Sequence, residues 1–86
     1  MPKFSYHRLD ANHAEIRREL ERAGAVVVPD GPVDLLVGFR GKNYLLEIKT
    51  EKGKLRESQV KFVRRWTGQV DVVRSAEEAL KAIGAL

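Results

Sequence analysis

The sequence predicts a single-domain α/β fold in which one mixed β-sheet carries helices on its faces. The chain has 86 residues, which is the length of one small domain. Its hydrophobic fraction of 43% and charged fraction of 33% are ordinary for a globular protein. Segments with helical apolar spacing alternate with short β-branched runs, in the order helix, three strands, helix, strand, helix.

The first helix is expected to follow an N-terminal arm. Residues 1–9 have no clear apolar period, so we expect an arm or loop there and the domain itself over residues 10–86. Apolar residues follow helical spacing from Asn12 to about Ala23, and Gly24 is a suitable helix end. The expected inner face of this helix is formed by Ile16, Leu20 and Ala23.

Three short strands are expected next, and the second and third should form a hairpin. Each is rich in β-branched or apolar residues, whereas proline, glycine and polar residues separate them. The strands are expected at Ala25–Val28, Val33–Phe39 and Tyr44–Lys49, with a turn over residues 40–43.

A helix, a strand and a final helix complete the predicted domain. Ser75 and Glu78 have the spacing of a capping box, which marks the start of the last helix. These elements are expected at Arg56–Trp66, Val70–Val73 and Ser75–Ile83, with Gly68 ending the first of them.

Asp34 and the run Glu47-Ile48-Lys49 are the residues that point to chemistry. Side chains alternate along a strand, so Glu47 and Lys49 share one face, and Asp34 lies opposite the apolar face of its own strand. A charge in an apolar strand is costly unless it is paired or metal-bound. Magnesium prefers oxygen ligands, so Asp34, Glu47 and the Ile48 carbonyl suit it. Lys49 could orient an attacking water or neutralise charge on a phosphate.

The hairpin Pro32-Val33-Asp34 … Glu47-Ile48-Lys49 resembles the PD-(D/E)XK nuclease signature, with Val33 inserted before the aspartate. The wider pattern, over about residues 10–84, is similar to small VRR-NUC-type and Holliday-junction-resolvase-like nucleases, including compact phage proteins. The resemblance implies a restriction-endonuclease-like core. It also implies a DNA endonuclease that hydrolyses phosphodiester bonds with water as nucleophile and Mg²⁺, or Mn²⁺ in its place, as cofactor. The matching stretches are residues 10–16, 33–38, 44–49 and 55–59, the last preceding Trp66.

The same resemblance implies two further catalytic residues. Glu15 matches an acidic position on the first helix that often completes the metal site, and Gln59 matches a polar position that commonly points toward the active site. Glu15 has a structural alternative, because Asn12 and Glu15 also have capping-box spacing. Glu19, one turn further on the same face, is a rival acidic candidate.

Basic residues near the hairpin are candidates for DNA binding. The chain has 16 Lys and Arg against 12 Asp and Glu, a net charge of +4, which favours a polyanionic partner. Lysines in turns are also often merely solvated, and the arginines of the first helix suit a surface charge mixture. The expected phosphate contacts are Arg40, Lys42, Lys52, Lys54 and Arg56.

Each of these residues also has an ordinary structural interpretation. Asp34 could be a turn residue after Pro32, and Glu47 with Lys49 could form a solvated strand face. Trp66 has helical spacing from Phe62, which favours a core position over a platform for stacking bases. His7 and His13 are isolated, and a ligand role is the less favoured interpretation for each.

We expect the enzyme to act on duplex, branched or junction DNA with little sequence specificity. Cutting two strands is simpler for a homodimer, because a chain this small offers one active site. With no cysteine and no apolar run long enough to cross a membrane, the sequence fits a cytoplasmic protein, of a bacterial host if phage-encoded. A helicase or packaging component is a conceivable partner. The competing hypotheses are a catalytically inactive DNA-binding module of the same fold and a purely structural domain. They are separated by whether Asp34, Glu47 and Lys49 meet in space.

Overall fold

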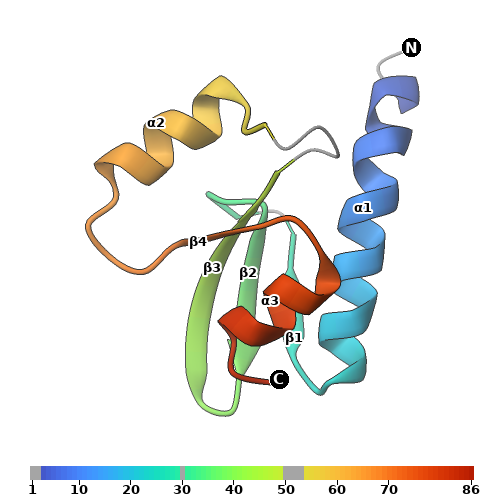
Figure 1. Ribbon diagram of the computed structural model, residues 1–86, viewed down its shortest axis with the longest axis vertical. Helices are drawn as coiled ribbons and strands as arrows, with labels where there is room; N and C mark the ends of the chain where they lie inside the picture. Colours follow the sequence, from blue (N-terminus) through green and yellow to red (C-terminus); the bar gives the residue numbers. More distant parts are fainter. Residues whose placement is uncertain (1–2, 30, 50–53) are drawn as a thin grey trace.

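The computed structural model describes residues 3–29, 31–49 and 54–86, with side chains described from residue 12 onward. Figure 1 shows the arrangement of its elements. The order of helices and strands expected from the sequence is confirmed. The elements are α1 (Lys3–Arg22), β1 (Val26–Val28), β2 (Leu35–Phe39), β3 (Lys42–Ile48), α2 (Glu57–Arg65), β4 (Asp71–Val73) and α3 (Ala76–Ala82).

Helix α1 begins nine residues earlier than its apolar pattern predicts. Residues 3–9 are helical, so the arm expected over residues 1–9 is wrong for that part, and residues 1 and 2 lie outside the described residues. Extending an existing helix adds one hydrogen bond per residue without a new nucleus, so helix can continue past the end of an apolar stripe. Gly24 ends the helix as expected, with φ of 103°, and the Ala25 N–H donates to the Leu20 carbonyl at 3.1 Å.

The four strands form one mixed sheet in the order β1-β2-β3-β4. The first two pairings are antiparallel and the β3–β4 pairing is parallel. The β2–β3 turn is shorter than expected, because Arg40 and Gly41 alone make it, with φ of 51° and 79°. Two successive residues with positive φ are typical of a tight type I′ hairpin turn.

The hydrophobic core lies between one face of the sheet and the helices α1 and α3, which pack together. The expected inner faces of the strands are confirmed, whereas Ala23 of the expected helix face is exposed. Helix α2 lies apart from α1 and α3, near the end of the sheet where β3 finishes (Figure 1). No helix in the described part of the chain is long and apolar enough to span a membrane. The largest fully buried side chains are Ile16, Leu20, Leu35, Val37, Leu46 and Val73.

Candidate active site

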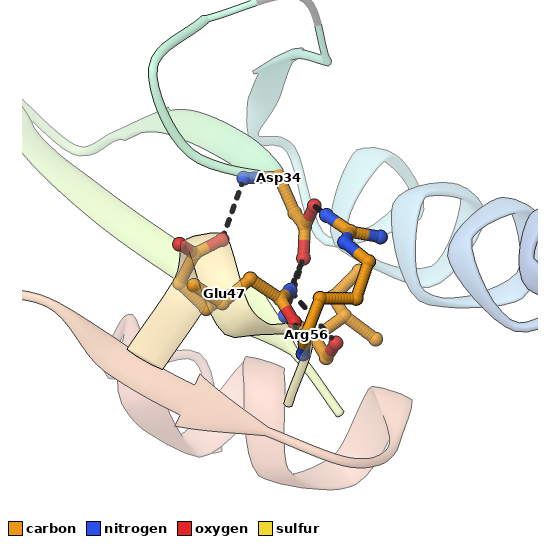
Figure 2. Close-up of polar contacts among 5 residues, drawn as sticks. Asp34, Glu47 and Arg56 are labelled. Carbon is orange, nitrogen blue, oxygen red and sulfur yellow. Dashed lines mark hydrogen bonds and ion pairs between the residues drawn. The ribbon is translucent and has the colours of Figure 1, made fainter. Parts of the chain in front are cut away.

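Asp34 and Glu47 lie directly across from one another where β2 begins and β3 ends. The β2–β3 register pairs Leu35 with Leu46, and one further step along both strands places Asp34 opposite Glu47. The backbone N–H of Asp34 donates to Glu47 Oε1 at 3.0 Å, and the backbone N–H of Ile48 donates to Asp34 Oδ2 at 2.8 Å. Figure 2 shows both side chains within one cluster of polar contacts. The expected meeting of these two carboxylates is confirmed, and their catalytic roles stay predictions.

Gln59 connects the start of α2 to this pair. Its side-chain amide nitrogen donates to Asp34 Oδ2 and to the Ile48 carbonyl, the latter at 3.2 Å. Its amide oxygen accepts from the backbone N–H of Arg56 at 2.6 Å. Gln59 is only 2% exposed, so these bonds are shielded from water. The structure therefore places Gln59 at the site, as the resemblance implied.

Arg56 forms an ion pair with Asp34 that the sequence reasoning missed. Its guanidinium Nη2 lies 3.0 Å from Asp34 Oδ1 (Figure 2), and the Asp34 side chain is 8% exposed against 46% for Arg56. A DNA contact was expected of this arginine. In the structure its charge compensates a nearly buried carboxylate, which would otherwise be costly, and its contact with DNA stays a prediction. Its position three residues before Gln59 is the one sequence signal that could have suggested the contact.

Glu47 is the acidic residue of the site whose ionised form is disfavoured by its surroundings. It is 3% exposed, so the expectation of a solvated strand face is wrong for this residue. Burial raises the pKa of the Glu47 carboxyl, and the charge and side chain of Asp34 raise it further. The hydrogen bond from the Asp34 backbone and the Gln59 side chain act in the opposite direction. A nearby cation favours the ionised forms of two neighbouring carboxylates that have little access to water.

The donor set of this site fits a hard divalent cation. Asp34 and Glu47 supply carboxylate oxygens, and the Ile48 carbonyl next to them supplies a neutral one. Magnesium prefers one or two carboxylates together with water and substrate phosphate oxygens. Among the described residues, no three Asp, Glu, His or Cys side chains group into a metal site. Asp34 and Glu47 are thus the two acidic metal ligands that the described residues provide at this site.

Glu15 does not join the two carboxylates. It is exposed on α1 and belongs to no metal-type cluster of the described residues. Its alternative as a capping residue is also wrong, because Asn12 lies inside α1 rather than at its start. The Asn12 side-chain amide instead reaches the Lys49 carbonyl at 3.5 Å. The rival Glu19 pairs with Arg22 at 3.3 Å, as expected for a surface charge mixture.

Lys49 follows β3 directly and its backbone N–H donates to the Val73 carbonyl at 2.9 Å. The side chain is half-buried. Within residues 12–29, 31–49 and 54–86, no hydrogen bond or ion pair joins its ammonium to either carboxylate. Its charge instead contributes to the lowered pKa of Glu78, after the larger effects of Arg74. The full three-residue cluster is therefore not assembled here.

The basic residues expected to contact DNA lie in two separate places. Arg40 lies within the hairpin turn. Lys42 begins β3, five residues from Glu47, which is roughly 17 Å at the usual strand rise. The Arg40 guanidinium lies over the Phe39 ring, 4.7 Å from its centroid. Lys52 lies outside the described residues and Lys54 is exposed. Their DNA contacts stay predictions.

Asp34 and Glu47 border a hollow of about 240 Å³. It is lined by Asp34 and Glu47 together with Pro29, Gly31, Pro32, Val33, Arg56, Ser58 and Gln59. A buried acidic pair is thus connected to a space that a substrate group could enter.

Trp66 is not the core residue that its spacing predicts. It is 45% exposed and stacks on Phe62, with ring centroids 5.1 Å apart and planes inclined by 20°. Helical spacing identifies a common face, but it does not say whether another layer covers that face. His13 is half-buried and belongs to no metal-type cluster of the described residues, and the His7 side chain lies outside them.

Comparison of the chain with protein-family models, with curated proteins and with solved structures gives no match. The interpretation of the site therefore depends on its own geometry and chemistry.

Proposed function

We propose that this protein is a magnesium-dependent DNA endonuclease of the PD-(D/E)XK type. The observation that carries the proposal is the pair of buried carboxylates, Asp34 and Glu47, at one end of a β-hairpin beside an open hollow. The backbone carbonyl of Ile48 and the basic surplus of the chain support it. The resemblance of Glu47-Ile48-Lys49 to the nuclease signature points to the same chemistry.

The reaction is hydrolysis of a phosphodiester. Water attacks the phosphorus and one P–O ester bond breaks, leaving a phosphate monoester on one product and a hydroxyl on the other. Asp34, Glu47 and the Ile48 carbonyl would hold Mg²⁺, which supplies an acidified water and stabilises charge on the phosphate. Manganese, which also accepts carboxylate and water oxygens, would be expected to replace it.

The remaining groups of the site orient the ligand oxygens or neutralise charge on the phosphate. Gln59 fixes the Asp34 carboxylate and the Ile48 carbonyl in one direction, because its amide nitrogen donates to both. Arg56 holds Asp34 Oδ1. Lys49 would act on the phosphate or on the attacking water once its flexible side chain turns toward the hollow. Pre-orientation of this kind lowers the cost of assembling the transition state.

The alternative function is a catalytically inactive DNA-binding module of the same fold. The absence of a contact between Lys49 and the carboxylates in the described residues favours keeping this alternative. It predicts DNA binding that weakens steeply with salt and no cleavage with any divalent metal.

A cleavage assay with two isosteric variants tests the proposal. Wild type, Asp34→Asn, Glu47→Gln and the control Glu77→Gln are incubated with Mg²⁺ or Mn²⁺ and duplex, flap, single-stranded and four-way DNA. Glu77 suits the control because it is an exposed carboxylate on α3 with a 3.2 Å pair to Lys81. We expect both site variants to cut at least about a hundredfold more slowly, and the control to cut like wild type.

Two results would contradict this proposal. Absence of metal-dependent cleavage on all four substrates, with DNA binding retained, would favour the inactive module. Cleavage that survives both substitutions would exclude Asp34 and Glu47 as the active site.

A further inference from the structure

A second hollow, of about 600 Å³, lies beside the carboxylate site along α2. Pro32 and Ser58 line both hollows, so the two spaces adjoin. The other residues lining the second hollow all come from α2. They are Lys61, Phe62, Arg64 and Arg65. We name this hollow the α2 groove.

The α2 groove is basic, and its cations pair with no carboxylate of the described residues. Among the residues that line it, three carry a positive charge and none carries a negative one. The ion pairs of the described residues engage Arg17, Arg22, Arg56, Arg74 and Lys81, and none engages Lys61, Arg64 or Arg65. All three are exposed. Unpaired cations along one groove suit a row of phosphates, since binding releases condensed counterions.

The α2 groove also has an aromatic wall. Phe62 lines it, and Trp66 stacks on Phe62 while remaining 45% exposed. The Trp66 indole N–H donates to the Gln69 carbonyl at 3.0 Å, which fixes the ring. A Cβ at Gly68 would lie 2.9 Å from the indole nitrogen, so glycine there lets the chain pass close to the indole. The exposed ring of Trp66 is thus held in a fixed orientation against the half-buried Phe62.

A cationic groove with an aromatic wall is the arrangement by which proteins bind unpaired nucleic-acid strands. Phosphates follow the charges, and the open faces of the bases stack on the rings, with about 1–3 kcal/mol per stacked base in known cases. In a duplex these faces are already stacked on neighbouring bases. We propose that the α2 groove binds an unpaired DNA strand and leads it to the carboxylate pair.

Cleavage of the strand after it binds the α2 groove rests on the proposed function. The α2 groove adds the class of DNA that would be cut. If Asp34 and Glu47 cut DNA, the preferred substrates have an unpaired arm or strand next to the cut, such as flaps and single strands. Fully paired duplex would be the poorer substrate. Binding to the α2 groove itself requires no metal and is testable without cleavage.

The test is binding of a fluorescent single-stranded oligonucleotide and of the matching duplex, measured by anisotropy in EDTA. The groove variant Arg64→Glu/Arg65→Glu is compared with Arg18→Glu/Arg22→Glu on α1. Both reverse two exposed arginines of one helix, so their net charges match. We expect the groove variant to lose about tenfold or more in single-strand affinity, and the α1 variant to lose less than about threefold.

Trp66 gives an independent readout, because it is the chain's one tryptophan. Its fluorescence should be quenched by the single strand and much less by the duplex, since stacking on a base requires an open base face. Trp66→Leu should weaken single-strand binding at unchanged charge. Circular dichroism and the melting temperature check that every variant is folded.

Three results would overturn the α2 groove as a strand site. These are equal losses in the two charge-reversed variants, equal affinity for single strand and duplex, or unchanged Trp66 fluorescence at saturation. Strand binding that maps to the groove without any cleavage would refute the proposed function alone. Cleavage with strand binding that is unaffected by the groove variant would refute the groove alone.

Discussion

Glu47 is the residue whose ionisation the fold opposes most clearly. Burial, together with the smaller effect of the charge of Asp34, raises the pKa of its carboxyl above the ordinary 4.5. The folded chain therefore holds the Glu47 proton more tightly than the unfolded chain does. The contribution of Glu47 to stability is fully present below about pH 4.5 and is lost as the pH rises through its folded pKa.

Replacing Glu47 by glutamine should remove this dependence. Glu47→Gln keeps the shape and an oxygen acceptor for the Asp34 N–H, but it carries no charge. We expect its free energy of unfolding without metal to be higher than that of wild type at pH 7, by about 1 kcal/mol. Its decline above pH 4.5 should also be flatter than in wild type. Urea unfolding between pH 4 and 8 measures both effects.

Glu57→Gln is the control for Glu47→Gln, since Glu57 is an exposed carboxylate in the first turn of α2. Added Mg²⁺ should stabilise wild type and the control, because a ligand bound only by the folded state raises stability. It should not stabilise Glu47→Gln. Identical pH profiles for all three proteins would show that Glu47 ionises as freely in the folded chain as in the unfolded one.

Helix α2 is anchored mainly by one amide. Gln59 is its one fully buried residue, and its bonds reach Asp34, the Ile48 carbonyl and the Arg56 N–H. Val60, Phe62 and Val63 are half-buried, and the other residues of the helix are exposed. Unsatisfied buried donors and acceptors are expensive, so the loss of this one side chain should loosen the whole element.

Gln59→Ala should therefore lower the free energy of unfolding by about 1–3 kcal/mol. Amide hydrogen exchange should increase throughout α2, and much less in α1 and α3. Gln69→Ala is the matched control, because the Gln69 amide also bonds backbone groups, those of Leu45, but is exposed to water. Equal destabilisation by the two substitutions would argue against a special anchoring role for Gln59.

At the scale of the whole molecule, each chain offers one carboxylate site at one end of its sheet. Cutting both strands of a duplex or branched DNA is simpler with two such sites, and a two-fold dimer supplies them with one sequence. Size-exclusion chromatography with light scattering should therefore give a mass near twice 9.7 kDa at micromolar concentration. A monomer at that concentration would instead favour cutting of one strand at a time.

The fold and the central pair of the site follow from short-range patterns. Alternation along β2 and β3 separates Asp34 and Glu47 from the apolar face, and a hairpin brings them into register. The start of α1 was missed because residues 3–9 have no apolar stripe. Trp66 was misassigned because spacing alone does not reveal whether a face is covered.

The sequence by itself determined the order of the elements, the faces of the strands and the meeting of Asp34 with Glu47. These depend on local periodicity and on one tight turn. Only the tertiary structure decided that Arg56, 22 residues from Asp34, neutralises it, that Glu15 stays apart and that the basic side of α2 is open. Such contacts depend on how α2 and α1 dock against the sheet. Docking is set by the summed packing of distant residues, which no local pattern records.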